Sequence, residues 1–241
     1  MSATEAATLP LAAMTAAIGL YQRLGLPQPW DSLPASATHH AIPLVIYGAA
    51  SAVGFFALQF ARRSNIHPLI CVAGRARDYV SEFIEPDKGD VVIDYRQSDD
   101  DLIAALRTAL GERPLRHAFD AVSEKGSPQI LGEVLEKKGD GVAGGQVTFV
   151  LGGKKEVPEG VEQSTTLVGS VHRDAKDFGY VYFQYIARGL KEGWFRGHRT
   201  EVVPGGLGGI QKALEDLKAG KASGVKYVFR IADTEGVVRE E

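Results

Sequence analysis

Residues 44–54 constrain the fold more than any other part of the chain. They begin as a continuous apolar run, break into small residues, and are followed by apolar positions with helical spacing through Phe55 and Leu58. This order is typical of a buried strand, a tight turn and a helix. A strand that is apolar on both faces belongs in a parallel sheet covered on both sides, so we expect further strands beside it.

The turn within this stretch suits a phosphate group. Small residues let the backbone come close to a ligand, and the N–H groups at a helix start point outward with the positive end of the helix dipole. The usual dinucleotide fingerprint has glycine at three places, where this chain has Ala49, Ser51 and Gly54. The turn alone therefore leaves two interpretations open, a nucleotide site or a tight strand–helix connection without a ligand.

The same alternation of strand and helix continues along the chain. We expect strands at residues 44–48, 68–74, 91–95, 118–123, 146–151 and 166–171, and helices at 9–26, 100–110, around 130–135, 178–190 and 210–217. This pattern predicts an α/β fold with a doubly wound parallel sheet of about six strands and right-handed crossovers. Ligands in such sheets lie beyond the carboxyl ends of the strands. The Ser51 turn, Arg75 and the residues after Val122 and Leu151 should therefore share one edge.

The end of the second strand carries the signal for a particular cofactor. An NAD-binding fold has Asp or Glu there for the ribose 2′-hydroxyl, whereas this chain has Arg75 and Arg77. Guanidinium groups hold a 2′-phosphate that a carboxylate would repel, so the two arginines favour NADPH over NADH. The alternative is that both are solvated surface charges.

Composition excludes several other classes of function. The chain has 241 residues, 44% of them hydrophobic, and a formal net charge of −3. The charge gives no reason to expect nucleic acid or an anionic membrane as a partner, and the apolar stretches are judged shorter than the roughly 18 residues of a membrane span. The single cysteine, Cys71, lies inside an apolar run, so we expect a buried thiol and an intracellular, cytoplasmic protein.

Two further patterns have ordinary structural explanations. His39 and His40 are adjacent in a loop with no Cys or carboxylate cluster nearby, so a metal site is not favoured. The aromatic residues of the 178–190 helix indicate core or oligomer contacts more than a ligand platform.

Several motifs together resemble one known family. They are residues 7–12 (Ala-Thr-Leu-Pro-Leu-Ala), 47–54, 92–96, 119–122, 169–171, 205–207 and 220–226. In this order they resemble the medium-chain dehydrogenase/reductase family, in its zinc-free quinone reductase and enoyl reductase branch, which includes fungal trans-acting enoyl reductases and toxin-cluster oxidoreductases.

The resemblance implies a division of the chain into three parts. Residues 1–43 would be a linking helix and loop, 44–194 an NADPH-binding Rossmann domain, and 195–241 a C-terminal segment of the catalytic domain. Members of the family begin with a β-rich, chaperonin-10-like domain, whereas this chain starts at the linking helix. We therefore expect residues 200–231 to expose apolar surface or to pair with a second chain, as a homodimer or through a partner that supplies the missing domain.

The resemblance also implies which residues contact the cofactor. They are Ser51, Ala52, Val53 and Gly54 at the pyrophosphate, Arg75, Arg77 and Tyr79 at the 2′-phosphate end, Ser123 and Leu151 near the nicotinamide ribose, and Gly206 and Leu207 near the nicotinamide. The zinc branch needs Cys and His ligands that a chain with one cysteine lacks, so no metal is expected.

The leading hypothesis is an NADPH-dependent oxidoreductase that transfers hydride to an activated C=C bond of an enoyl thioester or to a quinone. In this chemistry the protein mainly orients cofactor and small-molecule substrate, and no catalytic residue can be named. The second hypothesis is a truncated, catalytically incomplete protein that binds NADPH without turnover. A methyltransferase of similar topology is less favoured, because Arg75 stands where it would have an acid.

Overall fold

The computed structural model describes residues 1–31 and 41–237, so His39 and His40 lie outside the described residues. Its centre is a parallel sheet with the strand order β3-β2-β1-β4-β5-β6. The strands are β1 (Leu44–Tyr47), β2 (Leu69–Ala73), β3 (Val91–Asp94), β4 (His117–Asp120), β5 (Gln146–Phe149) and β6 (Glu162–Thr165). This is the doubly wound order, and it confirms the predicted fold class.

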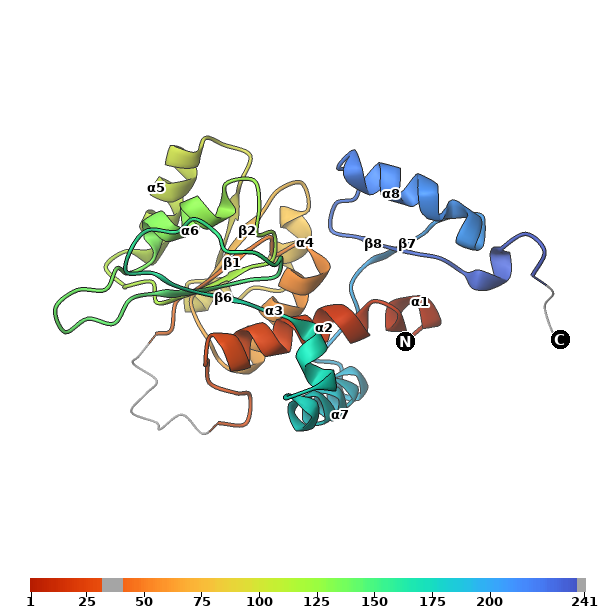
Figure 1. The fold of residues 1–241 in the computed structure, drawn as a ribbon, viewed down its shortest axis with the longest axis horizontal. Helices are drawn as coiled ribbons and strands as arrows, with labels where there is room; N and C mark the ends of the chain where they lie inside the picture. Colours follow the sequence, from red (N-terminus) through yellow and green to blue (C-terminus); the bar gives the residue numbers. More distant parts are fainter. Residues whose placement is uncertain (32–40, 238–241) are drawn as a thin grey trace.

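Helices cover both faces of the sheet (Figure 1). They are α1 (Ala3–Ala6), α2 (Leu9–Ala17), α3 (Ala52–Arg63), α4 (Arg77–Ser81), α5 (Asp99–Leu110), α6 (Ser127–Val134), α7 (Lys176–Glu192) and α8 (Ile210–Lys218). In β1, Leu44 and Ile46 point into the cluster formed with α2, α3 and α7. Val45 and Tyr47 point into the cluster formed with α5 and α6. The continuous apolar run thus reflects burial on both faces, as predicted.

The sixth strand differs from the prediction. An apolar strand was expected at residues 166–171, but β6 ends at Thr165 and residues Val168–His172 form a 3₁₀ helix, η4. Pairing ends where the backbone N–H of Thr166 bonds the carbonyl of Phe149, 2.8 Å away at the end of β5. β6 lies at the sheet edge and its polar residues are partly exposed, so it has no apolar run that a sequence pattern could reveal.

The N-terminal helix is longer and more apolar than the sequence reading allowed. The segments α1, α2 and the π-helical η1 (Ile18–Arg23) together span the 21 residues Ala3–Arg23, and an 18-residue window of this span has a mean hydropathy of 1.3, enough by length and composition to cross a membrane. However, 61% of this apolar window is buried inside the protein. The Tyr21 hydroxyl bonds the Phe60 carbonyl at 3.2 Å, and a Cβ on Gly19 would lie 2.3 Å from the Phe119 ring. This is how a core helix packs, so the estimate of short apolar stretches was wrong.

The C-terminal lobe, residues 200–237, stands beside the sheet domain (Figure 1). Its strands β7 (Thr200–Val202) and β8 (Lys226–Val228) pair in parallel, and α8 connects them. One set of large apolar side chains is between 38% and 62% exposed, namely Leu207, Ile210, Leu214, Leu217 and Ile231. The exposed apolar surface expected for this segment is therefore present.

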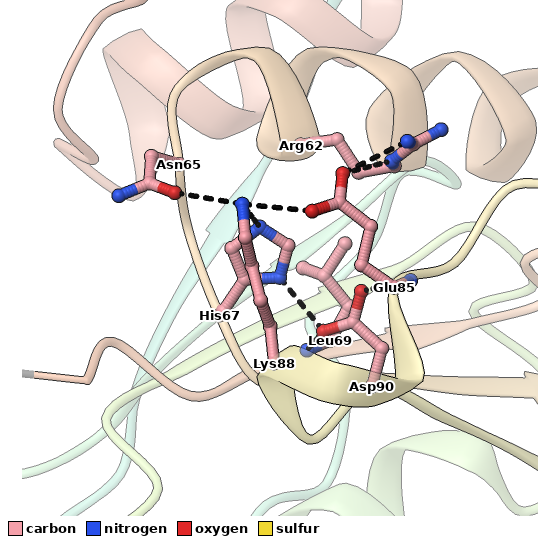
Figure 2. Close-up of polar contacts among 7 residues, drawn as sticks. All are labelled: Arg62, Asn65, His67, Leu69, Glu85, Lys88 and Asp90. Atoms are coloured by element: carbon pink, nitrogen blue, oxygen red, sulfur yellow. Dashed lines mark hydrogen bonds and ion pairs between the residues drawn. The ribbon is translucent and has the colours of Figure 1, made fainter.

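A buried polar cluster fastens the amino end of β2 (Figure 2). The Nδ1 atom of His67 lies 2.8 Å from Oδ1 of Asp90. The fully buried Asp90 carboxylate also accepts the backbone N–H groups of Leu69 at 2.7 Å and Glu85 at 2.9 Å. This cluster lies at the opposite end of the strand from the residues that follow β2, so it supports the fold and is remote from the predicted ligand edge.

Candidate cofactor site

The predicted ligand edge is formed where four adjacent strands end. Because β2, β1, β4 and β5 are parallel neighbours, the segments that follow them, here called the strand exits, meet at one edge of the sheet. The exits of β1 and β4 are in direct contact, since a Cβ on Gly48 would lie 2.6 Å from the Val122 side chain. The structure thus brings the Ser51 turn, Arg75, Ser123 and Leu151 to the same edge.

The turn after β1 has the geometry of an anion cradle. Ser51 is the N-cap of α3, and its hydroxyl accepts the backbone N–H of Gly54 at 3.1 Å. In the first turn of a helix the N–H groups have no intrahelical partner, and within residues 1–31 and 41–237 those of Ala52 and Val53 have no recorded acceptor. These two partly exposed donors and the helix dipole would suit a pyrophosphate.

Gly54 is the glycine that this turn requires. A Cβ at this position would lie 2.3 Å from the carbonyl oxygen of Gly48, so helix and turn are in backbone contact. The other two fingerprint positions tolerate a side chain, because Ala49 is buried in the core and Ser51 caps the helix. The replaced glycines are therefore compatible with a close turn.

Arg75 and Arg77 lie exposed beyond β2, each with an internal partner. The guanidinium of Arg75 donates to the carbonyl of Gly220 in the C-terminal lobe. Arg77 lies 3.6 Å from the Asp78 carboxylate and 3.8 Å from that of Asp94. Both charges are available at the surface, and a phosphate would compete with these exposed contacts.

Tyr79 is packed more tightly than a ligand-contacting side chain needs. The residue is 5% exposed, and its ring stacks on that of Phe55 with the centroids 5.1 Å apart. The guanidinium carbon of Arg199 lies over the Tyr79 ring, 3.8 Å from its centroid. Burial, partly offset by Arg199, raises the pKa of Tyr79 to about 12. The place of Tyr79 at the 2′-phosphate end stays a prediction.

Gly206 and Leu207 lie in the C-terminal lobe, at the opposite end of α8 from the Gly220 carbonyl that Arg75 contacts. They belong to η5 (Gly206–Gly209), where Leu207 N–H bonds the Thr234 hydroxyl at 2.9 Å. η5 directly precedes α8, whereas Gly220, which contacts Arg75, directly follows it. The two ends of a nine-residue helix are roughly 14 Å apart. Their assignment to the nicotinamide stays a prediction.

Sequence reasoning did not single out two buried residues at this edge. Asp120, at the end of β4, holds the exit that contains Ser123. His198, from the segment before β7, reaches the carbonyl of Ala50 in the turn. Asp120 lies in a motif used for the family resemblance, but that motif does not indicate that its side chain holds the β4 exit. No sequence pattern marks His198. Among the described residues, no group of three or more His, Cys, Asp and Glu side chains could hold a metal ion.

Curated relatives of the chain are fungal trans-enoyl reductases. Trans-enoyl reductase fsr4 of Gibberella fujikuroi is 43% identical over 203 residues, covering 83% of this chain and 58% of the relative. Trans-enoyl reductase ACTTS2 of Alternaria alternata is 31% identical over 243 residues, covering 96% and 66%. The chain belongs to the medium-chain dehydrogenase/reductase superfamily, in the enoyl reductase branch. No family model matches it.

Solved structures show the same fold. The JamJ enoyl reductase aligns over 95% of this chain and 64% of its own, with a TM-score of 0.67 and 15% identity. CurA of Vibrio vulnificus, solved in complex with NADPH, aligns over 90% and 61%, with a TM-score of 0.63 and 16% identity. The chain thus spans about 58% to 66% of the length of these relatives and structures.

Proposed function

We propose that this member of the superfamily binds NADPH and reduces an activated C=C bond of an enoyl thioester, or a quinone. The observation that carries the proposal is the start of α3, where Ser51 caps the helix and leaves the N–H groups of Ala52 and Val53 directed outward at the strand exits. The trans-enoyl reductase names of its relatives and the NADPH bound in CurA support the proposal.

The choice of NADPH rests on charge at the end of β2. Arg75 and Arg77 follow the strand at positions where NAD-specific folds have a carboxylate. Exposed guanidinium groups can donate two parallel hydrogen bonds to a phosphate, an interaction that NADH cannot offer because it lacks the 2′-phosphate. The neighbouring Asp94 already shares Arg77, so cofactor binding would exchange one partner for another.

The chemistry asks for orientation more than for reactive side chains. A bound nicotinamide supplies the hydride. The turn with Ser51 would hold the pyrophosphate, and the exits of β4 and β5, with Ser123 and Leu151, would lie beneath the nicotinamide end. In this arrangement the residues of the chain bind and align the cofactor.

A second candidate is a protein that binds NADPH without turning over a substrate. It is favoured by the exposed apolar side chains of the C-terminal lobe, which support the related proposal that this lobe packs against a second unit.

Two measurements on the purified chain separate the candidates. The first is a titration of NADPH followed by nicotinamide fluorescence, and the second is steady-state oxidation of NADPH with a crotonyl thioester or simple quinones as acceptor. Saturable binding with acceptor-dependent oxidation supports the reductase. Binding without oxidation favours the second candidate, and the absence of binding contradicts both.

A further inference from the structure

The hydroxyl of Ser123 is fully used inside the protein. The residue is 1% exposed, and its Oγ donates to the backbone carbonyl of Asp120 at 3.0 Å. The same Oγ accepts the backbone N–H groups of Val150 at 2.9 Å and Leu151 at 3.3 Å. One buried side chain therefore joins the exit of β4 to the exit of β5, and it has no donor left for a ligand.

Asp120 holds the backbone that presents this hydroxyl. Its carboxylate is buried, with Oδ1 accepting the N–H groups of Val122 at 2.9 Å and Ser123 at 2.7 Å. Oδ2 accepts the hydroxyl of Ser127 at 2.6 Å. Burial raises the pKa of the Asp120 carboxyl, and these hydrogen bonds oppose that rise.

The backbone of Ser123 adopts a conformation that serine rarely takes. Its φ is +62°, in the left-handed region that favours glycine. Such a residue persists where surrounding contacts fix it, and such conformations cluster at functional sites. Here the fixing contacts are the carboxylate of Asp120 on one side and the backbone of β5 on the other.

We propose that Asp120 and Ser123 are positioning residues, which set the distance between the β4 and β5 exits and so orient the nicotinamide end of the cofactor. The proposal rests on the proposed function and changes the role expected of Ser123 from direct contact to support. Val122 links this network to the turn, because it lies against Gly48. Arg75 lies on the other side of β1, beyond β2, and is outside the network.

The position of the network predicts a selective effect on binding. A defect at the β4 and β5 exits should weaken contacts to the nicotinamide end and leave the adenosine end intact. Adenosine 2′,5′-bisphosphate carries the 2′-phosphate but no nicotinamide, so it reports on the adenosine end alone. The ratio of its affinity to that of NADPH separates local positioning from general loss of structure.

The test uses Ser123→Gly in the full chain. Glycine accepts the positive φ without strain, so the substitution removes the hydroxyl and its bonds to Val150 and Leu151 while keeping the backbone. We expect the Kd for NADPH to rise about tenfold and that for adenosine 2′,5′-bisphosphate to change less than about twofold in calorimetric titrations.

Thr148→Val is the matched control. Thr148 is buried in β5, and its hydroxyl bonds that of Thr166 at 2.7 Å; among the described residues it makes no hydrogen bond to the exits of β4 or β5. Its loss should lower the melting temperature as Ser123→Gly does but leave the affinity ratio at the wild-type value. This separates positioning from a purely structural role.

The outcomes are distinguishable. Suppose that wild type binds both ligands. If Ser123→Gly then lowers the affinity for both equally, or changes neither affinity, the positioning role is overturned while the proposed function stands. If wild type binds neither ligand, the proposed function fails, and the inference fails with it.

Discussion

The Nε2 atom of His198 lies 3.2 Å from the carbonyl oxygen of Ala50, so the segment before β7 contacts the turn after β1 directly. The other ring nitrogen, Nδ1, lies 3.0 Å from the carbonyl of Arg199. The backbone N–H of His198 donates to the hydroxyl of Thr8 at 3.1 Å. The C-terminal segment is thus fastened at once to the N-terminal helices and to the proposed pyrophosphate site.

His198 should make stability depend on pH in mildly acidic solution. Burial lowers its pKa from 6.5, and the positive charges of Lys226 and Arg199 add to this, against hydrogen bonds to the Arg199 and Ala50 carbonyls that raise it. The unfolded chain therefore binds a proton at a higher pH than the folded protein. The contribution of neutral His198 to stability is therefore complete above pH 6.5 and is lost as the pH falls below that value.

The measurement is urea denaturation of wild type and His198→Gln at a series of pH values. We expect the variant to lose less unfolding free energy than wild type as the pH falls from about 7 to about 5. His172→Gln, at an exposed site, should follow wild type. Equal pH dependence in His198→Gln and wild type would contradict this role.

Gly54→Ala should damage both the fold and the proposed binding site. The new Cβ would lie 2.3 Å from the Gly48 carbonyl oxygen, so the turn or the start of α3 must move. Such overpacking costs about 1–3 kcal/mol of unfolding free energy, and it would also displace the N–H groups of Ala52 and Val53.

Gly208→Ala is the control for this prediction, since a Cβ there meets no atom within 4 Å. Denaturant unfolding gives the stability of both variants, and an NADPH titration gives the affinity. A Gly54→Ala variant with wild-type stability and affinity would show that the close contact does not matter.

Glu85 should stabilise the protein in a lower pH window. Its carboxylate lies 2.7 Å from Nζ of Lys88 and 2.8 Å from the guanidinium of Arg62 (Figure 2). The bond from Lys88, followed by that from Arg62, lowers its pKa from 4.5 to about 2 against the effect of burial. The stabilisation by the Glu85 ion pairs is therefore present above pH 4.5 and is lost as the pH falls toward about 2.

Glu85→Gln should flatten that part of the stability curve. Because the carboxylate is 30% exposed, water and salt screen the pair, and we expect a loss of at most about 1 kcal/mol at neutral pH. Denaturation between about pH 5 and 2.5 at low and high salt measures it. If the unfolding free energy of the variant depends on pH in the same way as that of wild type, the ion pairs of Glu85 do not cause this pH dependence.

The sheet could be predicted largely from the sequence, because buried parallel strands are written as apolar runs. Successive side chains of β1 and β2 point alternately into the two core clusters, so both faces of these strands are buried and both strands read as continuous apolar runs. β6 could not be found in this way, because it lies at the edge and its residues Glu162–Thr165 are polar. The apolar run that follows it instead forms much of the 3₁₀ helix η4, which contacts α7.

The segments that form the site could be predicted from the sequence, but the long-range contacts that join them could not. The Ser51 turn and Arg75 follow recognisable strand ends. The contact of His198 with Ala50 joins residues 148 positions apart, which no local pattern reveals. Ser123 was expected at the right edge, but its inward hydroxyl depends on a φ of +62° that the sequence does not indicate.

The most direct test of the account is cofactor selectivity, measured by calorimetric titration of NADPH and NADH into wild type and the Arg75→Ala/Arg77→Ala variant. We predict that wild type prefers NADPH and that the double variant loses about tenfold or more in NADPH affinity, while NADH affinity changes less than about twofold. Arg173→Ala, at an exposed arginine after η4, should behave as wild type. Equal losses for both cofactors, or no preference in wild type, would contradict the assignment of the 2′-phosphate to Arg75 and Arg77.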